Sequence, residues 1–328
     1  MRIRYLFILL IFIFLSGGCT PPKIKLYPSA ADPLKEFTLQ GEEEGKLLVI
    51  PIRGIISDAP KEQFFRTLPS MVQETVSQLR LAEKDKKIRA ILLKVDSPGG
   101  SVIASDVLYN EILAFKKRTG MKVVVAMMGV TASGGYYISL PADLIIAHPT
   151  TLTGSIGVIF FRPKVTGLMG KIGMAVEVNK SGKNKDMGSP FRPTTAEEEK
   201  ILQELTDKLG QRFLDRVAEH RKLDQRELSE ISSARVFLAD EALKLGLVDK
   251  IGYLDDAVRE AKKLAGLSED DRIIVYRRTE YPDDNLYNTS STRFEGRSFS
   301  LVSIDLPGSL SGLQTGFYYL WTPAVQGE

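Results

Sequence analysis

Apolar runs and amphipathic stretches alternate through the middle of the chain. Four apolar runs predict buried strands, at residues 47–56, 90–95, 122–128 and 144–147. Between the second and the third run, apolar residues recur every three or four positions from Ala104 to Phe115, which predicts a helix that ends near Gly120. Strand, helix and strand in this order form a right-handed βαβ unit. The pattern therefore predicts an α/β fold in which helices cover a parallel sheet.

More helices are predicted on both sides of this unit, and the pattern is lost towards the end of the chain. A helix-prone segment at 63–86 precedes the sheet's second strand, and residues 194–199 resemble a capping box that opens a long helix. The apolar stripe of that helix is formed by Ile201, Leu205, Leu209, Phe213 and Val217. A smaller helical unit follows, with a helix at 255–264. Residues 280–300 show no period, whereas 317–321 is apolar, so we expect it to dock on the domain or at a subunit interface.

The amino terminus resembles an export signal. Arg2 and Arg4 precede the apolar run 5–15, and small residues at 16–18 precede Cys19, the only cysteine. The run is shorter than the ~20 residues that span a bilayer, so cleavage after residue 18 is expected. The place of Cys19 resembles that of the lipidated cysteine in bacterial lipoproteins; plain secretion and an uncleaved signal anchor are the alternatives.

These patterns divide the chain into four parts. Residues 1–18 form the predicted signal peptide, and the polar, proline-containing segment 19–45 is a predicted tether. Residues 46–278 form the predicted globular domain, and 279–328 an irregular tail with an apolar end. The chain of 328 residues is 43% hydrophobic and 26% charged, with a net charge of +3, which is ordinary for a soluble globular protein. No segment alternates basic with aromatic residues, so we expect no nucleic-acid partner.

Two glycine-containing turns follow two of the predicted strands. Ser133 is followed by Gly134 and Gly135, and the earlier turn contains Gly99 and Gly100. On neighbouring parallel strands these turns would face each other. The hydroxyl of Ser133 could then act as a nucleophile, while the N–H of Gly134 and that of Gly99 or Gly100 hold the negative oxygen of an acyl-transfer intermediate. The competing interpretation is two ordinary turns of an α/β sheet.

A general base for this serine is not obvious from the residues alone. Neither His148, which precedes a proline, nor His220, on a charged helix surface, is well placed for a Ser-His-Asp triad. The polar loop 180–186 offers three lysines, Lys180, Lys183 and Lys185. A lysine removed from water loses proton affinity and can serve as a general base. Spacing does not choose among the three, and a solvated surface loop is the alternative.

Three motifs together resemble the signal peptide peptidase A family of serine peptidases. They are TASGGYY at 131–137, DSPGG at 96–100 and KSGKNKD at 180–186, and the resemblance extends from about residue 48 to about residue 263. It implies a Clp protease/crotonase-like fold of repeated β-β-α units. It also implies that Ser133 is the nucleophile, that Lys185 is the general base and that Ser155 orients Lys185, with Gly99, Gly100 and Gly134 at the oxyanion hole. Two residues depart from the family pattern: Ala234 and Leu238 stand where a glycine and a threonine-like residue are expected.

The resemblance implies a membrane-associated endopeptidase that works through an acyl-enzyme without a metal or cofactor. Its substrates would be signal peptide remnants or other membrane-associated peptides. The expected location is the bacterial cell envelope, with the catalytic domain on the extracytoplasmic side. A single-domain member is expected to assemble into a homo-oligomeric ring, and some members take active-site residues from the adjacent subunit. The alternatives are a crotonase-like acyl-CoA hydrolase or isomerase, which an export signal disfavours, and a non-catalytic membrane-anchored scaffold.

Overall fold

A large, mostly parallel sheet forms the centre of the protein. The computed structural model describes residues 32–63, 66–288 and 315–325. Within these residues the sheet has nine strands, and its main path runs in the order β1-β13-β2-β5-β7-β8-β12. Neighbours from β13 to β12 are parallel, whereas β1 runs antiparallel to β13. The strands are β1 (Lys35–Gln40), β2 (Glu43–Arg53), β5 (Ile88–Ser97), β7 (Lys122–Ala132), β8 (Leu144–Ala147), β12 (Lys250–Ile251) and β13 (Asp271–Arg277).

Shorter strands extend this sheet and form two others. β9 (Leu152–Gly154) pairs in parallel with the end of β7, and β11 (Val236–Leu238) pairs antiparallel with β9. A three-stranded sheet has the order β10-β14-β6, formed by β10 (Ile159–Phe161), β14 (Gly316–Leu320) and β6 (Gly99–Ser101). β3 (Lys61–Gln63) and β4 (Arg66–Leu68) form a hairpin.

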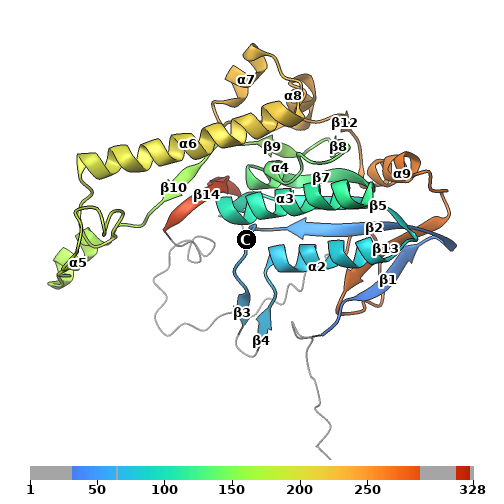
Figure 1. The fold of residues 1–328 in the computed structure, drawn as a ribbon, viewed down its shortest axis with the longest axis horizontal. Helices are drawn as coiled ribbons and strands as arrows, with labels where there is room; N and C mark the ends of the chain where they lie inside the picture. The colour runs from blue at the N-terminus through green and yellow to red at the C-terminus, as the bar shows by residue number, and fades with distance from the viewer. Residues whose placement is uncertain (1–31, 64–65, 289–314, 326–328) are drawn as a thin grey trace, which may run out of the picture.

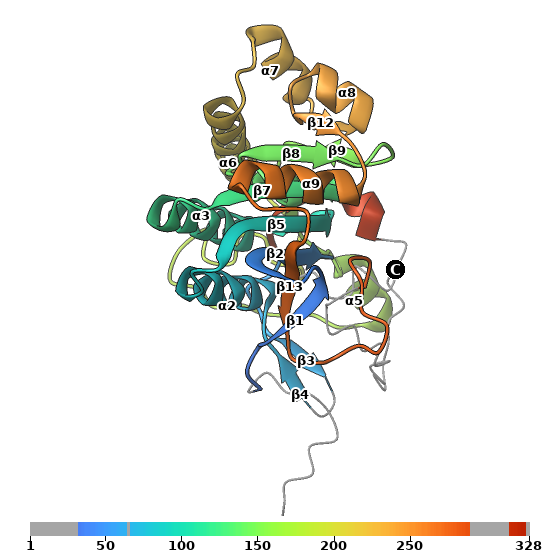
Figure 2. The same ribbon diagram turned by 90° about the vertical axis from the view of Figure 1, so that its right-hand side faces the viewer.

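Helices cover both faces of the central sheet (Figures 1 and 2). α2 (Met71–Lys84) and α3 (Val102–Thr119) pack on one face, and α9 (Leu254–Ala265) packs on the other. Alternate residues of β2 supply the two cores: Leu48 and Ile50 lie in the core with α2 and α3, and Leu47 and Val49 in the core with α9. Because both faces are buried, the strands are apolar at successive positions. The predicted α/β fold with a helix-covered parallel sheet is confirmed.

Local sequence signals explain where the predicted helices begin and end. The hydroxyl of Ser101 accepts a hydrogen bond from the N–H of Ala104 (3.1 Å) at the start of α3, and Gly120 ends this helix with φ 68°. α6 (Ala196–His220) begins with a capping box in which Thr195 and Glu198 bond to each other's N–H groups. Both helices are thus confirmed. The remaining helices are α4 (Gly134–Tyr137), α5 (Thr166–Ile172), α7 (Gln225–Ile231), α8 (Ala239–Lys244) and η1 (Thr322–Val325).

Residues 159–210, which we call the arm, extend away from the central sheet. The arm contains β10, α5, the loop after α5 and the N-terminal part of α6 (Figure 1). The C-terminal part of α6 packs on the domain through Phe213 and Val217, which are completely buried, whereas Leu205 on the arm is 39% exposed. The predicted apolar stripe of α6 therefore packs against the domain only in its second half.

The structure corrects three of the predicted boundaries. Residues 35–45 are not a tether, because β1 and the start of β2 belong to the sheet, with Phe37 and Leu39 packed against the core beneath α9. The helix predicted at 63–86 begins only at Met71, after the β3–β4 hairpin. The tail 279–328 is not irregular throughout: its apolar end forms β14 and docks on the domain.

The predicted signal peptide 1–18 and Cys19 lie outside the described residues. Among the residues that the structure does describe, no helix combines the length and the apolar character required to cross a bilayer.

Candidate active site

Ser133 lies at the junction between β7 and α4. Its φ of 54° falls in a region that residues with a side chain rarely adopt. The N–H of Ser133 donates to the carbonyl of Gly154 (2.8 Å), and its own carbonyl accepts from the N–H of Tyr137 (2.9 Å). The hydroxyl of Tyr136 donates to the carbonyl of Leu247 (2.9 Å), which ties α4 to the domain. The surrounding structure therefore holds a strained strand-to-helix turn in place, as is common at functional sites.

Two glycine turns meet beside Ser133. Gly99 has a φ of 101°, and a Cβ added there would lie 2.7 Å from the amide nitrogen of Gly134. A Cβ added at Gly134 would lie 3.1 Å from the amide nitrogen of Gly100. The N–H of Gly99 donates to the hydroxyl of Ser97 (3.1 Å). The backbones of the two turns are thus in contact, and Gly99 and Gly134 leave no room for a side chain between them.

The hydroxyl of Ser133 lacks a hydrogen-bond partner. The residue is 1% exposed, and no group within the described parts of the chain bonds to its Oγ. A buried hydroxyl without a partner costs about 1–3 kcal/mol, so such groups are rare and indicate a functional role or a missing partner. Ser133 is therefore a reactive candidate whose base does not contact it in this single chain.

Ser155 is close to Ser133 along the backbone of β9. It follows Gly154, whose carbonyl binds the N–H of Ser133, and its own φ is 51°. The N–H of Ser155 donates to the carbonyl of Arg235 (2.9 Å), and the residue is 8% exposed. No lysine among the described residues is hydrogen-bonded to the Ser155 hydroxyl. The structure therefore brings the two serines together without a lysine.

The three candidate lysines lie in the loop of the arm between α5 and α6. The amine of Lys180 forms an ion pair with Asp186 (2.6 Å), and that of Lys183 forms one with Glu197. Lys185 is exposed, and its amine pairs with no group in the described ranges. Lys185 is thus the one lysine of the motif whose amine is not held by a carboxylate.

An ion-pair network that the sequence did not reveal anchors this loop to α6. Arg192 pairs with Asp186, with Nε 2.7 Å from a carboxylate oxygen, and also with Glu198. The Arg192 guanidinium, with Lys180 as a second partner, lowers the pKa of the Asp186 carboxyl. The same guanidinium, together with the N–H of Thr195, lowers the pKa of Glu198 to about 2. Because Asp186 follows Lys185 directly, the network fixes the backbone that carries Lys185.

The two histidines have other partners. His148 hydrogen-bonds with Thr150 (2.9 Å), and His220 lies 2.7 Å from the hydroxyl of Tyr109, where burial lowers its pKa. Neither contacts Ser133, so the described residues contain no Ser-His-Asp triad.

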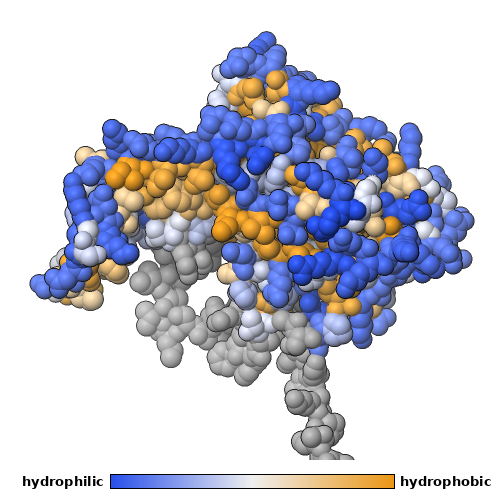
Figure 3. All heavy atoms as spheres, in the orientation of Figure 1, coloured by the Kyte–Doolittle hydropathy of each residue, from blue (hydrophilic) through white to orange (hydrophobic). Residues whose placement is uncertain are grey.

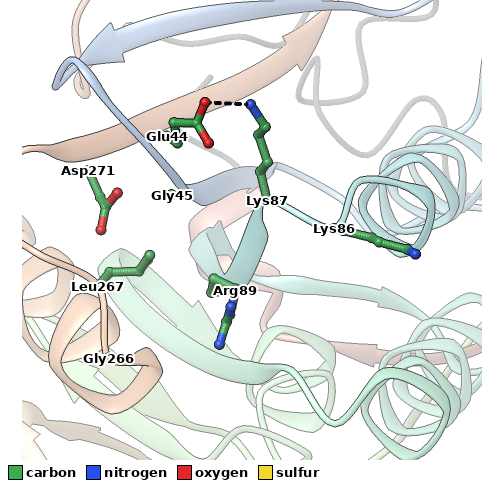
Figure 4. A pocket seen from close by; sticks show the side chains of 8 residues that line it. All are labelled: Glu44, Gly45, Lys86, Lys87, Arg89, Gly266, Leu267 and Asp271. Carbon is green, nitrogen blue, oxygen red and sulfur yellow. Dashed lines mark hydrogen bonds and ion pairs between the residues drawn. The ribbon is translucent and has the colours of Figure 1, made fainter.

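A separate hollow of about 330 Å³ lies at the opposite edge of the sheet, where β2 and β5 begin. Figure 4 shows Lys87 directed at Glu44, to which it is paired at 3.2 Å, while Lys86 points away from the hollow. Ser133 lies at the carboxyl edge of the sheet, so this hollow is not part of its site.

Comparison with known proteins is consistent with this geometry. Residues 115–268 match the description Peptidase family S49, and residues 67–150 match Clp protease. The chain is 34% identical over 253 residues to "Putative signal peptide peptidase SppA" from Enterococcus faecium, covering 77% of this chain and 73% of that protein. It is 40% identical over 195 residues to "Protease 4" from Salmonella typhi, covering 60% of this chain but 31% of that protein. It is 33% identical over 198 residues to "Serine protease SPPA, chloroplastic" from Arabidopsis thaliana, covering 60% and 29%.

The segment that matches the peptidase family contains Ser133, Ser155 and the lysine loop. The Enterococcus relative covers most of this chain and is itself mostly covered by it, so the likeness is not confined to a shared fragment. The strained serine turn packed against a glycine turn therefore belongs to an enzyme, and the chain is a serine peptidase of peptidase family S49.

Proposed function

We propose that Ser133 and Lys185 form a catalytic dyad that hydrolyses peptide bonds through an acyl-enzyme. The observation that carries this proposal is the buried Ser133 hydroxyl, which has no hydrogen-bond partner and lies between two glycine turns. A lysine amine is the group that the motif of this family supplies as a partner. Ser155, beside Ser133 at the end of β9, is the proposed positioning residue for that amine.

The proposed reaction uses side chains and backbone groups of this sequence, together with one water molecule. Neutral Lys185 takes the proton of the Ser133 hydroxyl as its oxygen attacks the peptide carbonyl. The N–H of Gly134 and that of Gly99 or Gly100 then hold the negative oxygen, each donor contributing roughly 3 kcal/mol in comparable sites. The N–H of Gly99 now donates to the hydroxyl of Ser97, so it must break this hydrogen bond before it can bind the negative oxygen. Lys185 next protonates the leaving amine and activates the water that hydrolyses the ester.

The ion pairs of the loop support Lys185 over its two neighbours. A carboxylate in contact with an amine favours the charged form of that amine, and a general base must be neutral. Lys180 and Lys183 are each held by a carboxylate, whereas Lys185 is free to enter a dry site.

The arm supports an arrangement in which one copy supplies Lys185 to Ser133 of another. The loop with Lys185 lies at the end of the arm that extends away from the central sheet (Figure 1). The arm also exposes apolar side chains, and Figure 3 shows this apolar surface along the arm below α6. The exposed residues are Leu168, Ile172, Met174, Val176, Val178, Phe191 and Leu205. Such a surface favours contact with a second copy, and we propose a homo-oligomeric ring.

Alanine variants test the dyad. Ser133→Ala and Lys185→Ala should each lose at least ~10³-fold of the kcat/KM for an unstructured apolar peptide. Lys180→Ala and Lys183→Ala are the matched controls and should keep most of the activity. Covalent labelling of Ser133 by a fluorophosphonate separates the peptidase from a non-catalytic scaffold, which would stay unlabelled. Full activity of Lys185→Ala would remove this lysine from the mechanism.

Mixing the two inactive variants tests whether the lysine comes from another copy. An assembly that contains Ser133→Ala and Lys185→Ala chains together pairs some intact serines with intact lysines. Partial activity should therefore return after mixing and reassembly, and it should fall when the protein is diluted. No recovery, with a normal assembled mass, would indicate that both residues act within one chain.

We also propose that the substrates are membrane-associated peptides, such as signal peptide remnants, and that the enzyme is held at the extracytoplasmic side of a bacterial membrane. The support is the predicted export signal with Cys19, and the likeness to a protein described as a signal peptide peptidase. Mass analysis of the mature amino terminus would show whether Cys19 carries a lipid.

A further inference from the structure

The single-turn helix α4 carries the reactive groups of the candidate site. Ser133 is the residue before it, and its first residue is Gly134, whose N–H is a proposed oxyanion donor. The carbonyl of Ser133 accepts the N–H of Tyr137 (2.9 Å), and the Ser133 side chain makes no capping hydrogen bond to the helix. A helix of one turn has few internal hydrogen bonds, so contacts with neighbouring elements must fix its position.

One of these contacts is a hydrogen bond from α4 to α3. The hydroxyl of Tyr137 donates to the carboxylate of Asp106 (2.7 Å). Tyr137 is completely buried, and burial together with this carboxylate raises the pKa of the phenol, so the hydroxyl stays protonated and remains a donor. A short hydrogen bond to a charged acceptor is roughly twice as strong as one between neutral groups. This bond therefore holds the end of α4 against α3.

The same carboxylate contacts α6, whose first half belongs to the arm. Nη2 of Arg212 donates to both carboxylate oxygens of Asp106, at 3.1 and 3.2 Å. The next residue of α6, Phe213, packs on the ring of Tyr137 with centroids 4.9 Å apart, so α4 lies between α3 and α6 (Figure 1). α3 itself follows the glycine turn at 99–101 directly. Asp106 thus connects the serine turn, the helix after the glycine turn and the base of the arm.

We propose that Asp106 is a positioning residue of the peptidase site, which holds α4 through the Tyr137 hydroxyl so that the Ser133 hydroxyl and the Gly134 N–H keep the geometry that the reaction requires. This inference rests on the proposed function of Ser133. No group in the described parts of the chain bonds to the Ser133 hydroxyl, so Asp106 acts through the backbone of α4. A displacement of about 1 Å can lower a catalysed rate about 10²-fold, and loss of one hydrogen bond should displace α4 by less.

The first test compares two variants that each lose one phenol hydroxyl. Tyr137→Phe should lower kcat for an unstructured apolar peptide roughly tenfold and leave KM within about twofold, because it disturbs groups that act in the transition state. Tyr109→Phe is the matched control: its ring is also buried and lies 5.2 Å from that of Tyr137, but its hydroxyl contacts His220 (2.7 Å). This control should keep kcat within about twofold of the wild type. Equal losses of kcat in the two variants would show that the Tyr137 hydroxyl only stabilises the fold.

A double-mutant cycle tests whether the effect passes through Asp106. Asp106→Ala removes the acceptor, so Tyr137→Phe should have little further effect on kcat in that background. Asp106→Asn keeps an amide oxygen that accepts the phenol hydrogen bond, and it should retain more of kcat than Asp106→Ala. Fully multiplicative losses in the double variant, or equal kcat values for Asp106→Asn and Asp106→Ala, would overturn the positioning role. The comparison of Tyr137→Phe with Tyr109→Phe does not depend on how Asp106→Ala folds.

Fluorophosphonate labelling separates this inference from the proposed function. The rate at which Ser133 is labelled should fall roughly tenfold in Tyr137→Phe, because labelling also depends on the placement of the serine and of the oxyanion donors. If Ser133 is labelled in no folded protein, the wild type included, the proposed nucleophile is wrong. If Ser133 is labelled at one rate in the wild type, in Tyr137→Phe and in Tyr109→Phe, the dyad stands and the role of Asp106 is refuted.

Discussion

Three residues other than glycine have a positive φ in the described part of the chain: Ser133, Ser155 and Ala234. Ser133 and Ser155 belong to the candidate site, where strain is held in place by the surrounding structure. Ala234 has a φ of 56° and precedes Arg235, whose carbonyl accepts the N–H of Ser155. The resemblance to the family led us to expect glycine at this position, and the backbone angle gives a physical reason for that expectation, since only glycine adopts it without steric cost.

Replacing this alanine should stabilise the protein. Ala234→Gly relieves the steric cost of a left-handed backbone, which exceeds the extra chain entropy of glycine, so the free energy of unfolding should rise by up to about 1 kcal/mol. Urea denaturation at neutral pH measures this free energy of unfolding. Ala218→Gly, at an exposed helical position of α6, is the matched control and should lower stability by about 0.5–1 kcal/mol. A decrease in both variants would contradict the argument.

Leu238 stands where the resemblance led us to expect a threonine-like residue, and its place in the fold gives a reason for that expectation. It is the residue before α8, and its side chain makes no capping hydrogen bond. A threonine-like residue would accept a hydrogen bond from the free N–H groups at the start of the helix. The departure therefore concerns the end of one short helix and leaves the serine turn unaffected.

At the scale of elements, strands buried on both faces and well-capped helices were predictable, whereas β1 and β14 were not. The apolar runs of β5, β7 and β8 and the caps of α3 and α6 are local signals that need no knowledge of the partner. β1 and β14 instead depend on strands far away in the chain, because β1 pairs with β13 and β14 pairs with β6 and β10. Their pairing is a tertiary property, which local patterns cannot express.

In the candidate site, too, local sequence signals were recognisable and contacts between distant segments were not. Ser133, Gly99, Gly100 and Gly134 were recognisable, because serine and glycine after a buried strand indicate a special turn. The contact of Tyr319 with this turn was not recognisable, although the apolar segment 317–321 indicated that it would dock. The ion pairs of Arg192 were hidden too, because a charged residue in a polar loop does not reveal its partners.

The Arg192 network should make stability depend on pH. The folded pKa values of Asp186 and Glu198 are below those of unfolded chains, about 3.9 and 4.3. Their contribution is therefore complete above about pH 4.3 and is lost as the pH falls through the folded values. We expect Arg192→Ala to lower the urea midpoint at pH 7, and the difference from wild type to narrow as the pH decreases below about 4.

A control distinguishes this effect from general acid sensitivity. Arg259→Ala removes an ion pair with Asp256 at an exposed position of α9. The difference in urea midpoint between Arg259→Ala and the wild type should change less over the same pH range. If the effect of Arg192→Ala is the same at pH 7 and at pH 3.5, the network does not contribute to stability through these two carboxylates.

At the scale of the whole molecule, the arm packs against the rest of the chain over only part of its apolar surface. Leu205 is 39% exposed on a helix whose later residues, Phe213 and Val217, are completely buried. The apolar stripe runs along the whole of α6, so its exposed first half is expected to contact a surface of another molecule.

A charge on this stripe should weaken assembly. Leu205→Glu places a carboxylate in the proposed contact between copies, and a buried charge without a partner is strongly unfavourable. The apparent dissociation constant of the assembly, measured by sedimentation, should rise at least ~tenfold, and activity at low protein concentration should fall with it. Lys208→Gln alters net charge by the same amount on an exposed position of α6 and should have little effect. An unchanged assembled mass in Leu205→Glu would place the contact elsewhere.

The direction of β1 determines where the chain enters the domain. Because β1 is antiparallel to β13, Lys35 lies opposite Arg277, at the carboxyl edge of the sheet, where Ser133 also lies. Fully extended, the residues between Cys19 and β1 reach at most about 50 Å, at ~3.3 Å per residue. A lipid at Cys19 would therefore hold the point where the chain enters the domain, on the same edge of the sheet as Ser133, within about 50 Å of the bilayer surface.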